Sequence, residues 1–136
     1  MTVDFAFICD CADKTLSGKL DAMGILRHLM APDFPALHPH LVLVVRFEIP
    51  SYEYNHPKQL SIVLVGPEGR EIARVETTLG IVPSSEPVSI IEHVVHFQNL
   101  TFPEAGDYAF HIQVQGETKK SVALRLVKYA REDAAP

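Results

Sequence analysis

The side chains best suited to bind a metal ion lie in two short groups near the start of the chain. Cys9 and Cys11 are the only two cysteines, and His38 and His40 flank a proline. Thiolate and imidazole are both zinc ligands, and residues two apart on an extended backbone point to the same side. Structural zinc sites usually add a second pair at similar spacing, which Cys9-x-Cys11 lacks. We therefore expect two reduced, largely buried cysteines and no cofactor, with a metal-dependent enzyme built on these four residues as an alternative.

The sequence motifs of other catalytic sites are absent. There is no Gly-x-Ser-x-Gly turn and no phosphate-binding loop. Acidic residues are scattered over expected loops and polar strand faces, so no carboxylate pair stands out for acid–base catalysis. His93 and His96 are three apart on an expected strand and would face opposite ways, while His111 could meet one of them across a sheet. These observations favour a protein that is not an enzyme.

Three residues of one loop form the candidate site for a small ligand. Tyr52, Tyr54 and His56 lie in the connection 50–57, which follows a long expected strand. Exposed aromatic side chains on loops can stack on a sugar or a peptide. Packing over the open end of the fold is the competing interpretation, so small-ligand or carbohydrate binding stays an alternative function.

The strand that begins at Tyr108 indicates how these residues are held in place. Large apolar residues occupy every second position from Tyr108 to Val114, with small or polar residues between them. This period of two is typical of an antiparallel strand with one buried and one solvated face. Without an amphipathic helix, the pattern predicts an all-β, antiparallel two-sheet β-sandwich. About eight strands are expected, over residues 4–12, 19–30, 40–49, 59–65, 71–79, 88–97, 108–115 and 119–129.

Glycine and proline mark where these strands end or bend. The run Gly66-Pro67-Glu68-Gly69 predicts a tight turn, which makes 59–79 the clearest hairpin. Gly24, in the middle of 19–30, indicates a bulge or a close backbone approach. The proline-rich segment 31–39 is expected to be a loop. Strand parity predicts a core of Leu41, Leu43, Val45, Phe47, Leu60, Ile62, Leu64, Tyr108, Phe110, Ile112, Val114, Val122, Leu124 and Leu126.

Length and composition indicate one globular domain. The chain has 136 residues, 47% of them hydrophobic, so we expect a single domain over 1–130 and a frayed tail over 131–136. The net charge is -5 and basic residues are scattered singly, which disfavours nucleic acid and an electrostatic membrane anchor. No apolar run is long enough to span a bilayer, and Asp4 and Asp10 surround the first one without a basic region before it. A cytoplasmic location is therefore expected.

The turn before the Tyr108 strand resembles a known structural motif. Glu104-Ala105-Gly106-Asp107-Tyr108 is similar to the acidic-x-Gly-x-Tyr turn of immunoglobulin-like domains, where the tyrosine hydroxyl is tied back to the turn as a tyrosine corner. The resemblance implies an immunoglobulin-like sandwich with Tyr108 as a structural anchor. The chain departs from that pattern in having no tryptophan and no cysteine pair between sheets.

A second resemblance covers nearly the whole chain. Its motifs are Phe7-Ile8-Cys9-Asp10, Gly18-Lys19-Leu20-Asp21-Ala22-Met23-Gly24-Ile25, Pro67-Glu68-Gly69-Arg70-Glu71 and Phe102-Pro103-Glu104-Ala105-Gly106-Asp107-Tyr108. In this order they are similar to an uncharacterised bacterial family of about this length, known as a domain of unknown function. The resemblance implies a bacterial cytoplasmic origin, and it transfers no site because the family has no established activity.

Two expected strands carry valines on the face opposite the core. These are Val42 and Val44 on one strand and Val63 and Val65 on another. If the strands are neighbours, the valines form a contiguous apolar patch, and such patches usually mark a covered surface. The cover is either the proline-rich segment 31–37 or a second copy of the chain, since two-fold dimers are the commonest assembly. We therefore predict a non-catalytic module for protein–protein interaction or a structural role, with a homodimer or another protein as partner.

Overall fold

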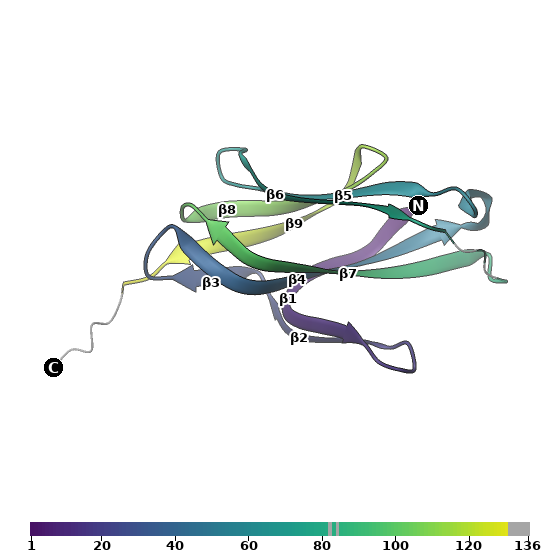
Figure 1. Cartoon of the computed structure of the whole chain (residues 1–136), viewed down its shortest axis with the longest axis horizontal. Coiled ribbons are helices and arrows are strands. Elements are labelled where there is room, and N and C mark those ends of the chain that lie inside the picture. The colour runs from purple at the N-terminus through teal and green to yellow at the C-terminus, as the bar shows by residue number, and fades with distance from the viewer. Residues whose placement is uncertain (82, 84, 131–136) are drawn as a thin grey trace.

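The computed structural model describes residues 1–130 apart from 82 and 84, and these form nine strands in two sheets that lie face to face (Figure 1). The four-stranded sheet has the order β2-β1-β4-β7, and the five-stranded sheet has the order β3-β9-β8-β5-β6. Neighbouring strands are antiparallel except for the short parallel pair of β3 and β9. The predicted all-β sandwich is confirmed, and the predicted tail over 131–136 lies outside the described residues. The elements are β1 (Thr2–Lys14), β2 (Leu20–Leu26), β3 (His28–Ala31), β4 (Ala36–Pro50), the 3-10 helix η1 (Ser51–Glu53), β5 (Lys58–Val65), β6 (Glu71–Leu79), β7 (Val88–Phe102), β8 (Gly106–Val114) and β9 (Glu117–Lys128).

The hairpin predicted over residues 59–79 is formed by β5 and β6. In its turn, the N–H of Gly66 donates to the carbonyl of Arg70 at 2.8 Å, and the N–H of Gly69 donates to the carbonyl of Gly66 at 3.0 Å. Gly69 has a φ of +80°, a backbone conformation that glycine adopts without steric cost. The local sequence is therefore sufficient to specify this turn.

Within the described part of the chain, no helix is long and apolar enough to cross a membrane.

The single strand predicted over 19–30 is in fact two strands in different sheets. β2 pairs with β1, whereas β3 runs beside β9. The chain crosses between the sheets at Arg27, whose carbonyl accepts a hydrogen bond from the N–H of Arg125 at 2.9 Å. Alternation tells which way side chains face but not which sheet a strand joins, so the pattern alone does not reveal this crossing.

The loop predicted over 31–39 is shorter than expected, because β4 already begins at Ala36 and includes Pro39. Proline has no N–H, so it is unfavourable in a strand with neighbours on both sides. β1 pairs with β4 only between Val42 and Glu48. At Pro39, β4 therefore has a neighbour on the β7 side alone, and the proline is tolerated there.

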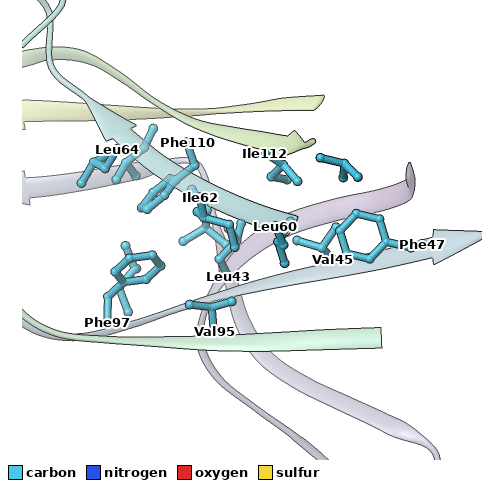
Figure 2. Close-up of a cluster of buried hydrophobic side chains, with 14 of the residues drawn as sticks. Leu43, Val45, Phe47, Leu60, Ile62, Leu64, Val95, Phe97, Phe110 and Ile112 are labelled. Carbon is cyan, nitrogen blue, oxygen red and sulfur yellow. The ribbon is translucent and has the colours of Figure 1, made fainter. Parts of the chain in front are cut away.

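The space between the sheets is filled by one large cluster of apolar side chains (Figure 2). All of the predicted core residues are buried in it except Val122, which is partly buried. The ring centres of Phe97 on β7 and Phe110 on β8 lie 5.2 Å apart, so aromatic contacts join the two sheets. Burying each large apolar side chain contributes about 2 kcal/mol to folding. The core is thus the main source of stability.

The hairpin of β1 and β2 forms an arm that leaves the four-stranded sheet. β1 stops pairing with β4 after Cys9 but continues to pair with β2 as far as Lys14. Figure 1 shows β1 bending sharply, with the hairpin running back on the outer side of the layer that contains β4 and β7. We refer to residues 10–25 as the arm.

Candidate functional site

The four valines predicted as one interaction patch do not form one. Val42 and Val44 belong to the four-stranded sheet, whereas Val63 and Val65 belong to the five-stranded sheet. The two pairs therefore lie on opposite outer faces of the sandwich, and the condition that the two strands are neighbours is not met. Val42, Val44 and Val63 are buried and Val65 is half-buried.

The cover over Val42 and Val44 comes from the arm. Small and medium apolar side chains of the arm join them in a second cluster, separate from the main core. The segment 31–37 does not provide this cover, because Phe34 packs against the main core and Leu37 is exposed. The second cluster consists of Cys9, Ala12, Val42 and Val44, with Phe5, Phe7, Leu20, Ala22 and Val94 packed against it.

The bend at the base of the arm depends on Gly24. Its φ is +69°, and a Cβ added there would lie 2.3 Å from Oδ2 of Asp10. The Asp10 carboxylate therefore occupies the space above the Gly24 backbone, so a side chain, and not the backbone segment expected, makes the close approach at this glycine. Before Asp10, Ile8 is buried in the main core and Cys9 in the outer cluster, whereas after Asp10 the buried residue of β1 is Ala12, also in the outer cluster. Cys9 and Ala12 are three residues apart, so the alternation of buried and exposed side chains is broken at Asp10. The bend thus turns a different face of the arm toward the sheet.

Two histidines from different strands hold this bend. Nδ1 of His40 on β4 lies 3.1 Å from the carbonyl oxygen of Asp10, and its Nε2 lies 3.1 Å from Nδ1 of His96 on β7. The carbonyl only accepts hydrogen bonds, so Nδ1 of His40 donates. Sequence spacing pairs His40 with His38 and misses His96, since only the register of β4 against β7 brings residues 56 apart together.

The shape of the His40–His96 contact favours a shared proton over a metal ion. The ring centres are 5.3 Å apart, about the sum of the 3.1 Å contact and the two distances from ring centre to nitrogen. The rings, tilted by 25°, therefore meet edge to edge and the two nitrogens point at each other. A tetrahedral ion needs lone pairs that converge at an angle. Among the residues described, no three His, Cys, Asp or Glu side chains are grouped to hold a metal.

Cys9 and Cys11 are both free thiols but differ in environment. Cys9 is fully buried under the arm, and burial raises the pKa of its thiol, with smaller contributions from Cys11 and Asp10. Cys11 is exposed on the solvent side of the arm. The expectation that both are largely buried is wrong for Cys11, because the bend at Asp10 changes which side chains face the sheet.

The solvent side of the arm carries large apolar side chains. Leu16 in the turn is fully exposed, and Met23 and Ile25 on β2 are 69% and 63% exposed. Met23 pairs with Cys11 across the hairpin, and Ile25 pairs with Cys9. We call Cys11, Leu16, Met23 and Ile25 the contact face. Cys11 and Met23 face away from Ala12 and Ala22, which cover Val42 and Val44, and Ile25 is exposed at the base of the arm.

A charged group closes the other end of the same outer sheet face. The guanidinium of Arg46 lies 4.7 Å from the centre of the Phe5 ring. Arg46 donates to Glu92 at 3.1 Å and lies 3.6 Å from Asp4. Its Nε has no hydrogen-bond partner among the described residues. The ion pairs fix Arg46 over the aromatic ring and shield the face that the arm leaves uncovered.

The residues of the predicted ligand loop do not converge. The hydroxyl of Tyr54 donates to the carbonyl of Glu86 at 3.0 Å, so it ties the loop to the segment before β7. Tyr52 is 78% exposed, and His56 is exposed as well. None of the five best-defined cavities among the described residues is lined by these three.

A cleft beside the base of the arm offers few groups for chemistry. It has a volume of about 280 Å³ and opens between β1 and β9. Arg27 and Ser121 supply its polar side chains, and its remaining lining is apolar. Binding sites usually add several convergent polar groups to such a lining. The cleft therefore lacks the features of a catalytic pocket.

Tyr108 bonds to the backbone of the turn that precedes β8. Its hydroxyl donates to the carbonyl of Glu104 at 2.6 Å and accepts from the N–H of Glu104 at 3.2 Å. Its ring is buried and meets Phe102 edge-on, with ring centres 5.1 Å apart. The residue thus anchors the turn between β7 and β8 to the core.

Fold and site together define a two-sheet, predominantly antiparallel β-sandwich whose first hairpin is folded over one outer face. Residues 4–127 match a family described as a family of unknown function, DUF6941, and the chain belongs to that family. The expected membership of an uncharacterised domain family is therefore confirmed. No curated protein matches the chain.

Proposed function

We propose that this chain is a non-catalytic module that works through protein–protein contact, and that the contact face of the arm is the surface it uses. One observation carries the proposal: large apolar side chains are concentrated on the outward side of the arm, where Leu16, Met23 and Ile25 are exposed. An exposed apolar surface of this kind commonly marks an interaction site. The opposite side of the arm is already buried, so internal packing does not explain these side chains.

The partner we propose is a second copy of the chain. β2 is an end strand of the four-stranded sheet, so one of its edges has no neighbouring strand within the described residues. Natural edge strands are usually protected by charged side chains, especially Lys, or by Pro, and β2 contains only one charged residue, Asp21, and no proline. The end strand β6, by contrast, carries Glu71, Arg74 and Glu76. Antiparallel pairing of β2 with its own copy is two-fold symmetric and closes as a dimer.

Charge substitutions on two similarly exposed isoleucines test this proposal. Ile25→Lys places a charge on the contact face, whereas Ile90→Lys, on β7 at the opposite end of the sheet, is the matched control. Sedimentation equilibrium at tens of micromolar should give dimers for the wild type and Ile90→Lys, and monomers for Ile25→Lys. A monomeric wild type, or an undisturbed dimer in Ile25→Lys, contradicts the proposal. Circular dichroism checks that each variant is folded.

We also infer that the sandwich is immunoglobulin-like. Two neighbour relations support this: β1-β4-β7 follow the order A-B-E, and β9-β8-β5 follow the order G-F-C of immunoglobulin domains. Tyr108 near the start of β8 then takes the place of the tyrosine at the start of strand F. An experimental structure with a different strand order would overturn this inference.

For the compartment, we propose a bacterial cytoplasm. Both cysteines are free thiols, as is usual in reducing compartments, and one of them is exposed on the arm. Fractionation of cells that produce the protein, with antibody detection, would place it in the soluble fraction. Its recovery in a secreted fraction would contradict this assignment.

A further inference from the structure

We propose that His40, His96 and the backbone carbonyl of Asp10 form a pH-operated latch, which holds the arm against the four-stranded sheet and opens when both rings are protonated. The latch joins three strands at one point: the bend of β1, the central strand β4 and the edge strand β7. The arm otherwise presents only small or medium apolar side chains to the sheet, namely Ala12, Leu20 and Ala22. Its seating therefore depends on the polar contacts at its base.

The neutral pair has a defined proton arrangement. The Asp10 carbonyl can only accept, so Nδ1 of His40 carries a proton and Nε2 of His40 has a lone pair. That lone pair faces Nδ1 of His96 at 3.1 Å, so the proton of this second hydrogen bond resides on His96. Nε2 of His96 is then left as the basic nitrogen, and His96 is exposed to solvent.

Successive protons have opposite effects on this arrangement. The first proton binds Nε2 of His96, and the resulting imidazolium still donates from Nδ1 to His40, now through a charge-assisted hydrogen bond. The second proton must bind Nε2 of His40, which already accepts that bond. Two N–H groups would then point at each other across 3.1 Å, and both rings would be cationic. The contact breaks, and His40 loses its fixed position under Asp10.

Other ionisable groups lie on the strands near the pair, and they determine which control variants the experiment needs. Asp10, Cys11 and Lys14 lie on β1, Asp21 lies on β2, His38 lies on β4 and His93 lies on β7. His93 pairs with Val45, a core residue, so it faces the opposite side of β7 from His96. It does not touch the latch, but burial and the charge of Lys14 on the arm lower its pKa, so the exposed His56 in the loop after β4 is the better matched control.

Opening the latch uncovers the second apolar cluster. Cys9, Val42 and Val44 have no exposed surface while the arm is in place. Release would give solvent access to the Cys9 thiol and would move the contact face. The consequence for partner binding rests on the proposed function, whereas the latch itself is intramolecular and does not.

The rate of thiol exchange at Cys9 measures arm opening directly. We would use the Cys11→Ser protein, leaving Cys9 as the only thiol, with dithiodipyridine, which reacts in acid as well as at neutral pH. The native rate is divided by the rate of the same chain unfolded in urea at the same pH. The protein is kept at a concentration where its measured mass is that of a monomer, so that failure of the proposed dimer leaves this measurement unaffected.

From neutral pH to the acid end of histidine titration, we expect the normalised rate to rise about tenfold or more, because the repulsion of two adjacent charges ranges from about fivefold when fully solvated to far more when partly shielded from water. His56→Gln, which changes an exposed histidine outside the latch, should keep this rise. His96→Gln should abolish it, because a glutamine amide can turn to donate to neutral His40 or accept from charged His40. The alternative outcome is that Cys9 in His96→Gln already reacts fast at neutral pH, with no further rise in acid. That result also shows that the pair holds the arm, and His40→Gln should then give the same result. An unchanged rate in the parent protein, or an equal rise in His96→Gln, overturns the proposal.

Discussion

Gly24 and Asp10 face each other across the base of the arm so closely that a Cβ at Gly24 would lie 2.3 Å from Oδ2 of Asp10. The carboxylate fills the position that any other residue at 24 would use for its side chain. This contact is part of the bend that turns β1 and β2 back over the sheet, and the covering of Val42 and Val44 follows from it.

Replacing Gly24 by alanine should therefore destabilise the arm. Gly18, in the arm's turn, is a matched control, because its φ is +83° but nothing lies within 4 Å of an added Cβ. We expect Gly18→Ala to cost about 1 kcal/mol for its left-handed backbone, and Gly24→Ala to cost more than that because the Asp10 side chain must also turn away. Urea unfolding measures both. Equal losses in the two variants would show that the Asp10 contact is not restrictive.

The two thiols should differ in native reactivity. The raised pKa of Cys9 lowers its thiolate fraction, and burial under the arm limits the access of a reagent to its thiol. Cys11, by contrast, is exposed. In folded, reduced protein at neutral pH, one thiol per chain should react rapidly with a maleimide, and unfolding should reveal the second. Peptide mapping should place the fast label on Cys11. Rapid labelling of Cys9 would mean that the arm does not cover it.

Removing the hydroxyl of Tyr108 should weaken the fold without abolishing it. The hydroxyl makes two hydrogen bonds with the backbone of Glu104. We expect Tyr108→Phe to lower the free energy of unfolding by about 1 kcal/mol, the usual net value of one hydrogen bond. Tyr52→Phe, which changes an exposed ring, should leave the urea midpoint unchanged. An unshifted midpoint in Tyr108→Phe would remove the anchoring role.

His93 should make the fold less stable in mild acid. Partial burial lowers the pKa of its imidazole below the ordinary 6.5, and the charge of Lys14 lowers it further. Below 6.5 the unfolded chain therefore binds this proton more readily than the folded chain, so stability falls as the pH drops toward the folded pKa. His93→Gln should lose less stability than the wild type between about pH 7 and pH 5. The exposed His56→Gln should follow the wild-type curve, and a His93→Gln curve identical to it would contradict the assignment.

Much of the sandwich can be predicted from side-chain alternation. The core positions on β4, β5 and β8 follow from it, because a strand buried on one face repeats every two residues. The turn between β5 and β6 follows from its glycines and proline. Local chemistry also identifies Tyr108, since its hydroxyl is tied to a turn only four residues away.

The candidate site could not be predicted in the same way, because it depends on which strands become neighbours. Val42 and Val63 have the same local pattern, yet the chain sends them to opposite faces of the molecule. His40 meets His96 only through the register of β4 against β7. The sharp bend after Cys9 leaves one local trace, Gly24, which marks a close approach but not the group that approaches.

The central claim, that β2 pairs with a second copy of itself, is tested most directly by amide hydrogen exchange at two protein concentrations. At high concentration, outward amides of residues 20–26 would enter hydrogen bonds with the partner strand and exchange more slowly than in dilute solution. The end strand β6, protected by charged side chains, should exchange at the same rate in both. Protection confined to residues 20–26 and dependent on concentration is the predicted result. Unchanged exchange in this strand, in samples shown to be dimeric by mass, would place the interface elsewhere and contradict the claim.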